Sequence, residues 1–116
     1  MRQSDPLPTQ PGVTVGYLED ACRELATVEI PELNLGLFSG PNTNANKARR
    51  STLANHAAEA ANLIALGNIE GAIAQLTILL KKIDGVGPPP DWMIDSPEKT
   101  ELADEVAELI ELLELL

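Results

Sequence analysis

Apolar residues recur at helical spacing along much of the chain, and the pattern is clearest in residues 97–116. Ser96 fits the N-cap position just before this segment, and Pro97 fits its first turn. A stripe with this spacing is typical of a helix that lies with one face against a core. The apolar positions are three or four residues apart: Leu102, Val106, Leu109, Leu113 and Leu116. We therefore predict an acidic C-terminal helix over 97–116, because Glu and Asp fill most of its other face.

A second helical pattern covers residues 42–84, and it is broken once, at Gly67. The asparagines of 42–46 offer N-cap side chains for an alanine-rich helix that runs to about Leu66. Gly67 fits the left-handed residue that ends a helix, and Asn68 fits the N-cap of the next. The second stripe follows at once: Ile69, Ile73, Leu76, Leu80 and Ile83. So short a connection places the two helices antiparallel, and we predict a helical hairpin over 42–84.

The N-terminal third is less regular. Residues 1–12 contain three prolines and are interpreted as a flexible linker or tail. In 13–41 we expect a helix capped by Thr14, followed by an irregular apolar strap that packs onto the other helices. One stretch of the strap alternates in polarity, which keeps a short strand as an alternative. Its apolar positions are Leu33, Leu35 and Leu37.

A loop rich in proline, residues 85–96, separates the hairpin from the last helix, and its triple proline prevents an immediate new helix. Trp92, the only tryptophan, is predicted to fold back as a structural plug over the open end of the hairpin rather than to stack on a ligand. Together these patterns predict one all-α domain over 13–116. We expect a small up-down bundle of three to four helices with an irregular apolar N-terminal segment.

Composition narrows the classes of partner. The formal net charge of the 116 residues is -10, which argues against nucleic acid and against docking on an anionic membrane. No segment approaches the roughly 20 apolar residues of a membrane span, so no membrane insertion is expected. Aromatic residues make up only 3%, so the core must be aliphatic, which suits helices. The acidic balance instead favours cationic partners or divalent ions.

Residues with catalytic potential are few. The single histidine, His56, has no second His or Cys near it in sequence, and a zinc site needs three or four ligands. Ser51 and Cys22 have side chains that can act as nucleophiles, but nothing in the sequence places either of them beside a base. We therefore expect no enzyme activity and no cofactor. A calcium site in the loop stays an alternative, with three carboxylates as ligands: Asp84, Asp91 and Asp95.

Two groups of residues are candidates for an interaction surface. The first is the apolar end of the last helix, which favours self-association: Leu109, Leu112, Leu113, Leu115 and Leu116. The second is a basic cluster at the start of the hairpin: Lys47, Arg49 and Arg50. The simpler interpretation of the basic cluster is a solvated face, or salt bridges to the acidic C-terminal helix. A docking patch for an acidic partner is the functional alternative.

Several short motifs follow one another in residues 47–116: LGNIEGAIAQL, then Asp84-Gly85, Asp91-Trp92 and Leu109-Ile110. In this order they resemble a small helical module found near the C-terminal ends of bacterial secreted and cell-surface multidomain proteins. The chain departs from that pattern in its triple proline and in lacking the loop cysteines of many members. The resemblance implies a non-catalytic accessory domain that serves as a spacer, a packing unit or an interaction surface beside neighbouring domains.

A weaker likeness concerns the hairpin alone, where Gly67-Asn68 followed by Ala72-Ile73 is similar to half of a tetratricopeptide repeat. That architecture needs several copies, and the sequence has no second one. We therefore expect a structural or protein–protein interaction module, extracellular or at the cell surface as part of a longer chain. The alternative is a free-standing cytoplasmic adaptor or regulator that forms a homodimer through its C-terminal helix.

Overall fold

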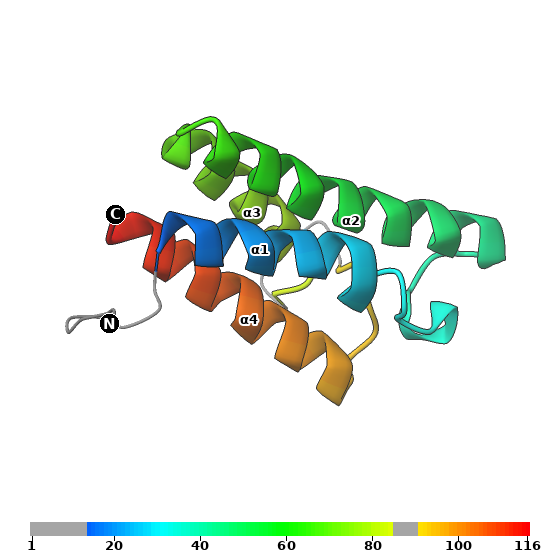
Figure 1. Cartoon of the computed structure of the whole chain (residues 1–116). Coiled ribbons are helices and arrows are strands. Elements are labelled where there is room, and N and C mark those ends of the chain that lie inside the picture. The colour runs from blue at the N-terminus through cyan, green and yellow to red at the C-terminus, as the bar shows by residue number, and fades with distance from the viewer. Residues whose placement is uncertain (1–13, 85–90) are drawn as a thin grey trace.

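The computed structural model describes residues 14–84 and 91–116, and within them the chain folds as an all-α bundle (Figure 1). The predicted tail, 1–12, and the triple proline of the loop lie outside the described residues. The predicted fold class is confirmed. The elements in chain order are α1 (Val15–Glu24), the π-helical turn η1 (Leu25–Glu29), the 3-10 turn η2 (Leu35–Leu37), α2 (Thr43–Ala65), α3 (Ile69–Lys81) and α4 (Pro97–Glu114).

The longest helix, α2, is the centre of the packing. It contacts α1 and η1 on one side and α3 on the other, while α4 packs mainly against α3. In Figure 1, α1 lies in front between α2 and α4, and α3 lies behind. The up-down order puts the start of α1, the α2–α3 turn and the end of α4 at the same end of the bundle. The first turns of α2 project beyond the other helices at the opposite end.

The alanines of α2 allow its neighbours to approach closely. Ala57, Ala60 and Ala61 have no exposed surface, and their spacing of three and four residues places them on one wide face of the helix. A helix flanked by two others must bury a wide stripe, and short side chains let the helix axes come near each other. Leu18, Cys22, Leu25, Leu76, Leu79 and Val106 of the other segments have no exposed surface and complete the core. In the stripe predicted for the second helix of the hairpin, Leu76 and Ile83 are buried, while Ile69, Ile73 and Leu80 are half-buried.

Each of the helices α1 to α4 begins with a capping side chain, as predicted. Each cap accepts a hydrogen bond from a backbone N–H three residues further on. The distances are 3.1 Å for Thr14, 2.8 Å for Asn42, 2.9 Å for Asn68 and 3.1 Å for Ser96. Since a cap of this kind contributes about 1 kcal/mol, the four starting points are fixed locally.

Gly67 ends α2 in the left-handed conformation, with a φ of 81°. Its N–H donates to the carbonyl of Ile64 at 2.9 Å, and the N–H of Asn68 donates to the carbonyl of Leu63 at 2.8 Å. This pair of bonds is a Schellman motif, which satisfies the last carbonyls of the helix. Asn68 at once caps α3, so two residues accomplish the reversal of the chain.

The strap differs from the alternative strand proposed for it. Leu35–Leu37 forms a 3-10 turn because the Asn34 side chain accepts the Gly36 N–H at 2.7 Å and caps the turn. In 14–84 and 91–116 the only β-type pairing is an isolated bridge between Phe38 and Met93. The helix predicted for the N-terminal part also continues further than expected, through η1. There the Ile30 N–H donates to the Leu25 carbonyl, five residues back, at 2.9 Å.

The left-handed turn yields a first prediction. Replacing Gly67 with alanine should lower the free energy of unfolding by about 1 kcal/mol, because L-residues pay that much for this conformation. An added Cβ meets no atom within 4 Å, so the cost is conformational and not steric. Urea unfolding followed by circular dichroism measures it.

Gly16→Ala is the matched control. Gly16 lies in the first turn of α1, and a Cβ there would sit 3.8 Å from Thr14 Oγ1, which is an ordinary contact. This variant should be stabilised by about 0.5 kcal/mol, since alanine favours a helix over glycine. Equal effects of the two substitutions would contradict the role assigned to Gly67.

Candidate functional site

Trp92, for which a plug was predicted, joins the loop to the strap and to the end of the hairpin. The backbone N–H of Trp92 donates a hydrogen bond to the Lys82 carbonyl at 2.8 Å, and the backbone carbonyl of Trp92 accepts one from the Ser39 N–H at 2.8 Å. The indole is half-buried against the core. The Lys82 ammonium lies 4.1 Å from the ring centroid, and the Arg49 guanidinium lies 5.5 Å from it. Such cation–π contacts hold the ring between the strap, α2 and the end of α3.

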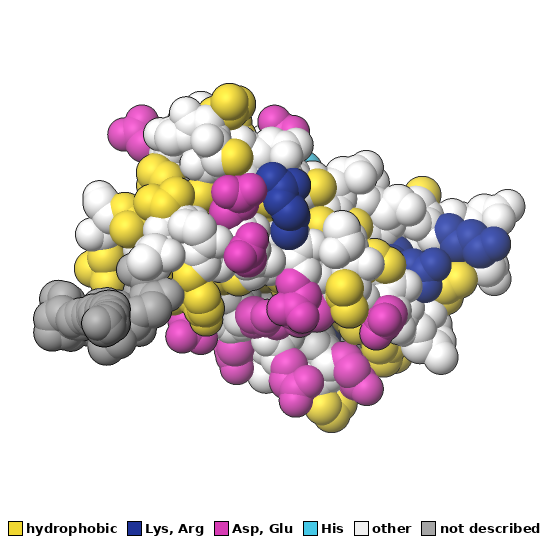
Figure 2. All heavy atoms as spheres, in the orientation of Figure 1, with side chains coloured by type: hydrophobic (Ala, Val, Ile, Leu, Met, Phe, Trp, Pro, Cys, Tyr) yellow, Lys and Arg dark blue, Asp and Glu magenta, His cyan; other side chains and the backbone are white. Residues whose placement is uncertain are grey.

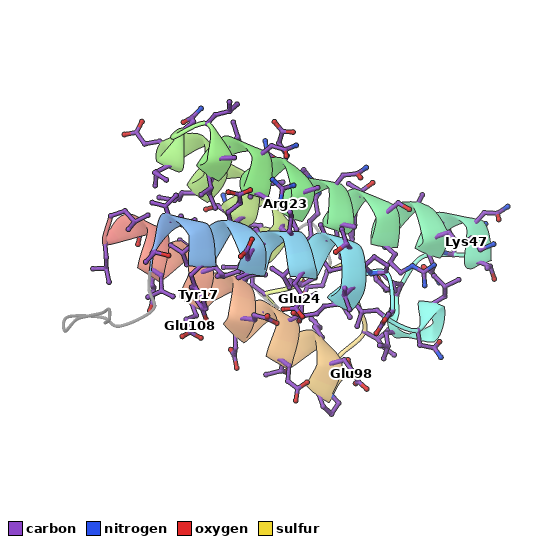
Figure 3. The ribbon with its side chains drawn as sticks, viewed as in Figure 1. Tyr17, Arg23, Glu24, Lys47, Glu98 and Glu108 are labelled. Atoms are coloured by element: carbon purple, nitrogen blue, oxygen red, sulfur yellow. The ribbon has the colours of Figure 1, made fainter. Side chains whose placement is uncertain are left out.

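The two arginines of the basic cluster bind the strap. These bonds take the place of the salt bridges to the C-terminal helix that were one interpretation of the cluster. Arg49 Nη1 donates to Ser39 Oγ at 3.2 Å, and Arg50 Nη1 donates to the Leu33 carbonyl at 2.9 Å. Both arginines are half-buried. α4 packs on α3 and, to a smaller extent, on α1, and not on the helix that carries these arginines. Lys47 alone is exposed, near the projecting start of α2 (Figure 3).

Two of the three carboxylates proposed for calcium hold a lysine. Lys99 Nζ lies 2.6 Å from Asp91 Oδ2 and 2.8 Å from Asp95 Oδ1, and only 7% of Lys99 is exposed. Hydrogen bonds to Asp91 and then Asp95 raise the pKa of Lys99, and the bond to Lys99 lowers the pKa of Asp95. In the described residues no group of three or more potential ligands is arranged for a metal. The Lys99 ammonium, from the first turn of α4, is thus the positive charge that Asp91 and Asp95 bind.

The three residues considered for catalysis, His56, Cys22 and Ser51, have different surroundings in the fold. His56 Nδ1 lies 2.9 Å from Gln75 Oε1, which links α2 to α3. Cys22 has no exposed surface, and burial raises the pKa of its thiol to about 11. At neutral pH this thiol is therefore protonated and a poor nucleophile. Ser51 lies on the exposed face of α2.

Of the five leucines predicted to form an interaction surface, only two are exposed to solvent. Leu109 and Leu113 are buried in the core of the chain itself, because the α4 stripe packs against α3, and Leu112 is half-buried. Leu115 and Leu116 are exposed, at 75% and 52%. This corrects the prediction for Leu109 and Leu113, which serve the fold.

Three further apolar residues are exposed at the same end of the bundle as Leu115 and Leu116. They are Val15 and Tyr17 at the start of α1, exposed by 45% and 52%, and Leu66 at the end of α2, exposed by 80%. These helix ends lie together in Figure 1, and apolar atoms gather there in Figure 2. We name this surface the apolar end: Val15, Tyr17, Leu66, Leu115 and Leu116. Sequence reasoning missed three of its members, although an up-down order predicts that these helix ends meet.

The seam between the N-terminal segment and α4 contains an acidic hollow of about 300 Å³. In Figure 2, acidic side chains gather over α4 and over this seam. Figure 3 shows Glu24 of α1 between α1 and α4. The pKa of Glu105 is raised to about 7, first by burial, then by a hydrogen bond with Glu29, and then by the charges of Glu29, Glu24 and Glu108. The residues lining the hollow are Glu29, Glu32, Leu33, Glu98, Glu101, Leu102 and Glu105.

From the sequence alone, the glutamates of the last helix are interpreted as a solvated face. The one signal available is that Glu98, Glu101 and Glu105 recur at helical spacing beside Leu102, which belongs to the buried stripe. Such positions flank a core. Glu105 is half-buried there, while Glu98 and Glu101 are exposed. The approach of Glu29 depends on how the N-terminal segment packs, and no local pattern encodes it.

Comparisons of the chain with protein-family models, with curated proteins and with solved structures find no match. The resemblance to a bacterial accessory module therefore stays a prediction. Among the described helices, none is both long enough and apolar enough to cross a membrane.

The buried ion pair yields a second prediction. Lys99→Met should lower the free energy of unfolding by roughly 3 kcal/mol, because it leaves the Asp91 carboxylate buried without its ammonium. Replacing both partners, as Asp91→Asn with Lys99→Met, should recover part of that loss. Chemical denaturation of the single and double variants measures both effects. The control is Lys81→Met, at an exposed lysine in the last turn of α3, and a loss of stability as large as that of Lys99→Met would contradict this account.

Proposed function

We propose that the chain is a non-catalytic protein–protein interaction module that binds its partner through the apolar end. The observation that carries this proposal is that five of the eight large apolar side chains exposed among the described residues lie at one end of the bundle. Soluble proteins seldom expose contiguous apolar surface, and where they do, it commonly marks an interaction site. The apolar end distinguishes an interaction module from a simple spacer, which needs no such surface.

Charge complementarity indicates the chemistry of the partner. The chain carries a formal net charge of -10, and acidic residues lie within one helical turn of the apolar end: Glu19 and Asp20 of α1, and Glu111 and Glu114 of α4. A partner surface must match both the apolar centre and this acidic surround. We therefore propose a basic amphipathic helix, with leucine-like side chains on one face and Lys or Arg beside them.

The proposed setting is an accessory domain of an exported bacterial protein, at the cell surface or outside the cell. Its support is the sequence resemblance of residues 47–116. In that setting the basic helix belongs to a neighbouring domain or to a separate protein.

A second candidate is the free-standing cytoplasmic adaptor that forms a homodimer. The exposure of Leu115 and Leu116 favours it, because these side chains can pair with a second copy. The high negative charge opposes it, since two copies would bring acidic surrounds together. A heterologous basic partner avoids that repulsion.

The third prediction tests the apolar end directly. A fluorescently labelled amphipathic helix of leucine and lysine should bind the chain, and anisotropy should give its affinity. Replacing Leu115 and Leu116 together with serine should weaken binding at least about tenfold, because burying each leucine is worth about 1.5–3 kcal/mol. The control is Ile94→Ser, an exposed apolar residue just before α4, which begins at the other end of the bundle.

The outcomes separate the candidates. Loss of binding in the leucine variant, with Ile94→Ser unchanged and helicity retained in both, supports the interaction module. Equal binding by all variants would show that charge alone attracts the peptide, and would overturn the proposal. Light scattering over a range of concentrations adds the third outcome: a dimer that is lost in the leucine variant would replace the proposed partner with a second copy.

A further inference from the structure

The seam between the N-terminal segment and α4 is the loosest part of the bundle. α1 and η1 pack mainly on α2, and α4 packs mainly on α3, so few direct contacts join α4 to α1. The acidic hollow lies in this seam, with Leu33 on one wall and Leu102 on the other. Because apolar contact across the seam is small, polar groups there have a large influence on how closely α4 is held.

The π-helical turn η1 brings one carboxyl group into this seam. Its bond from the Ile30 N–H to the Leu25 carbonyl spans five residues and not four, which changes the direction of the side chains that follow. Glu29, the last residue of η1, lines the hollow together with Glu105 of α4. These two glutamates come from segments 76 positions apart in the chain (105 − 29), and both line the same hollow.

All charged groups that line the hollow or act on Glu105 are acidic among the described residues. They come from every element around it: Glu24 of α1, Glu29 of η1, Glu32 of the strap, and Glu98, Glu101 and Glu108 of α4. With no cation lining the hollow, a proton is the group that can neutralise the pair. Two carboxyl groups in contact cannot readily both ionise, and one of them keeps its proton to a higher pH.

We propose that Glu29 and Glu105 form a proton-dependent clasp that holds α4 against the N-terminal segment. With one proton between them, the carboxyl group of one donates a hydrogen bond to the carboxylate of the other, and the seam is closed. When that proton leaves to water, two carboxylates face each other among further acidic side chains. Repulsion then loosens α4 from η1 and the strap, and the apolar walls of the hollow become more accessible. This inference is independent of the function proposed for the apolar end.

The direction of the pH dependence follows from the pKa of Glu105, which is about 7 in the folded chain and 4.5 ordinarily. Between those values the folded state holds a proton that the unfolded state has lost, so stability decreases as the pH rises. The contribution of the clasp is complete below pH 4.5 and is lost as the pH passes through about 7. The Lys99 site acts outside this window, because the pKa of Asp95 is lowered and that of Lys99 is raised.

The fourth prediction compares Glu105→Gln with the unchanged chain. Glutamine can donate a hydrogen bond to Glu29 at any pH, so the variant should melt about 5 °C higher than the unchanged chain at about pH 8. At about pH 5.5 the two should melt within about 1 °C of each other, because the proton is then in place. The matched control is Glu111→Gln, which removes the same charge from the exposed face of α4 and should change Tm equally at both pH values. A parallel His56→Gln variant accounts for the one histidine.

A direct titration completes the test. Carboxyl carbon NMR should show Glu105 titrating near pH 7, and Glu29→Gln should lower that midpoint toward 4.5, because a partner carboxylate is removed. A Glu105 that titrates with the other glutamates in the unchanged chain would overturn the clasp. So would a gain in Tm that is the same for Glu105→Gln and Glu111→Gln at about pH 8.

Discussion

The close packing of α2 between α1 and α3 is the constraint on which the rest of the structure depends. Ala57, Ala60 and Ala61 are fully buried, so the axis of α2 can lie close to both neighbours. The strap binds the same helix through Arg49 and Arg50. α4 is the exception, since it packs mainly on α3. Packing on α3 is therefore joined by the Lys99 ion pairs, the loop through Trp92 and the seam to η1 in holding α4.

Local chemistry explains what could be predicted from the sequence. Thr14, Asn42, Asn68 and Ser96 cap helices through bonds that span three residues, and Gly67 ends a helix within its own turn. Buried stripes are equally local, because they follow from helical spacing. Two kinds of feature could therefore be predicted from the sequence: where the helices begin and end, and which face of each helix is buried. The all-α architecture follows from these two kinds of feature together.

The parts of the candidate sites that were missed depend on which elements become neighbours in space. For Arg50 the sequence left open a solvated position, a salt bridge to the acidic last helix or a docking role, whereas in the structure it binds the carbonyl of Leu33. Glu29 of η1 and Glu105 of α4 line one hollow because of how the N-terminal segment and α4 are arranged, which no local pattern encodes. Leu109 and Leu113 share the spacing of Leu116 but not its exposure, since α4 extends past the core at its end. In each case the residue type was recognised, while its partner was set by tertiary packing.

The central claim is that α2 and its two neighbours form the stable unit, and that α4 is held to it by separate interactions. Native-state hydrogen exchange, measured amide by amide with NMR at low denaturant, tests this claim most directly. The account predicts that amides of α2 and α3 exchange only through global unfolding, while amides of α4 also exchange through a smaller opening of lower free energy. A single free energy of exchange shared by α2, α3 and α4 would contradict it, since the bundle would then open as one unit.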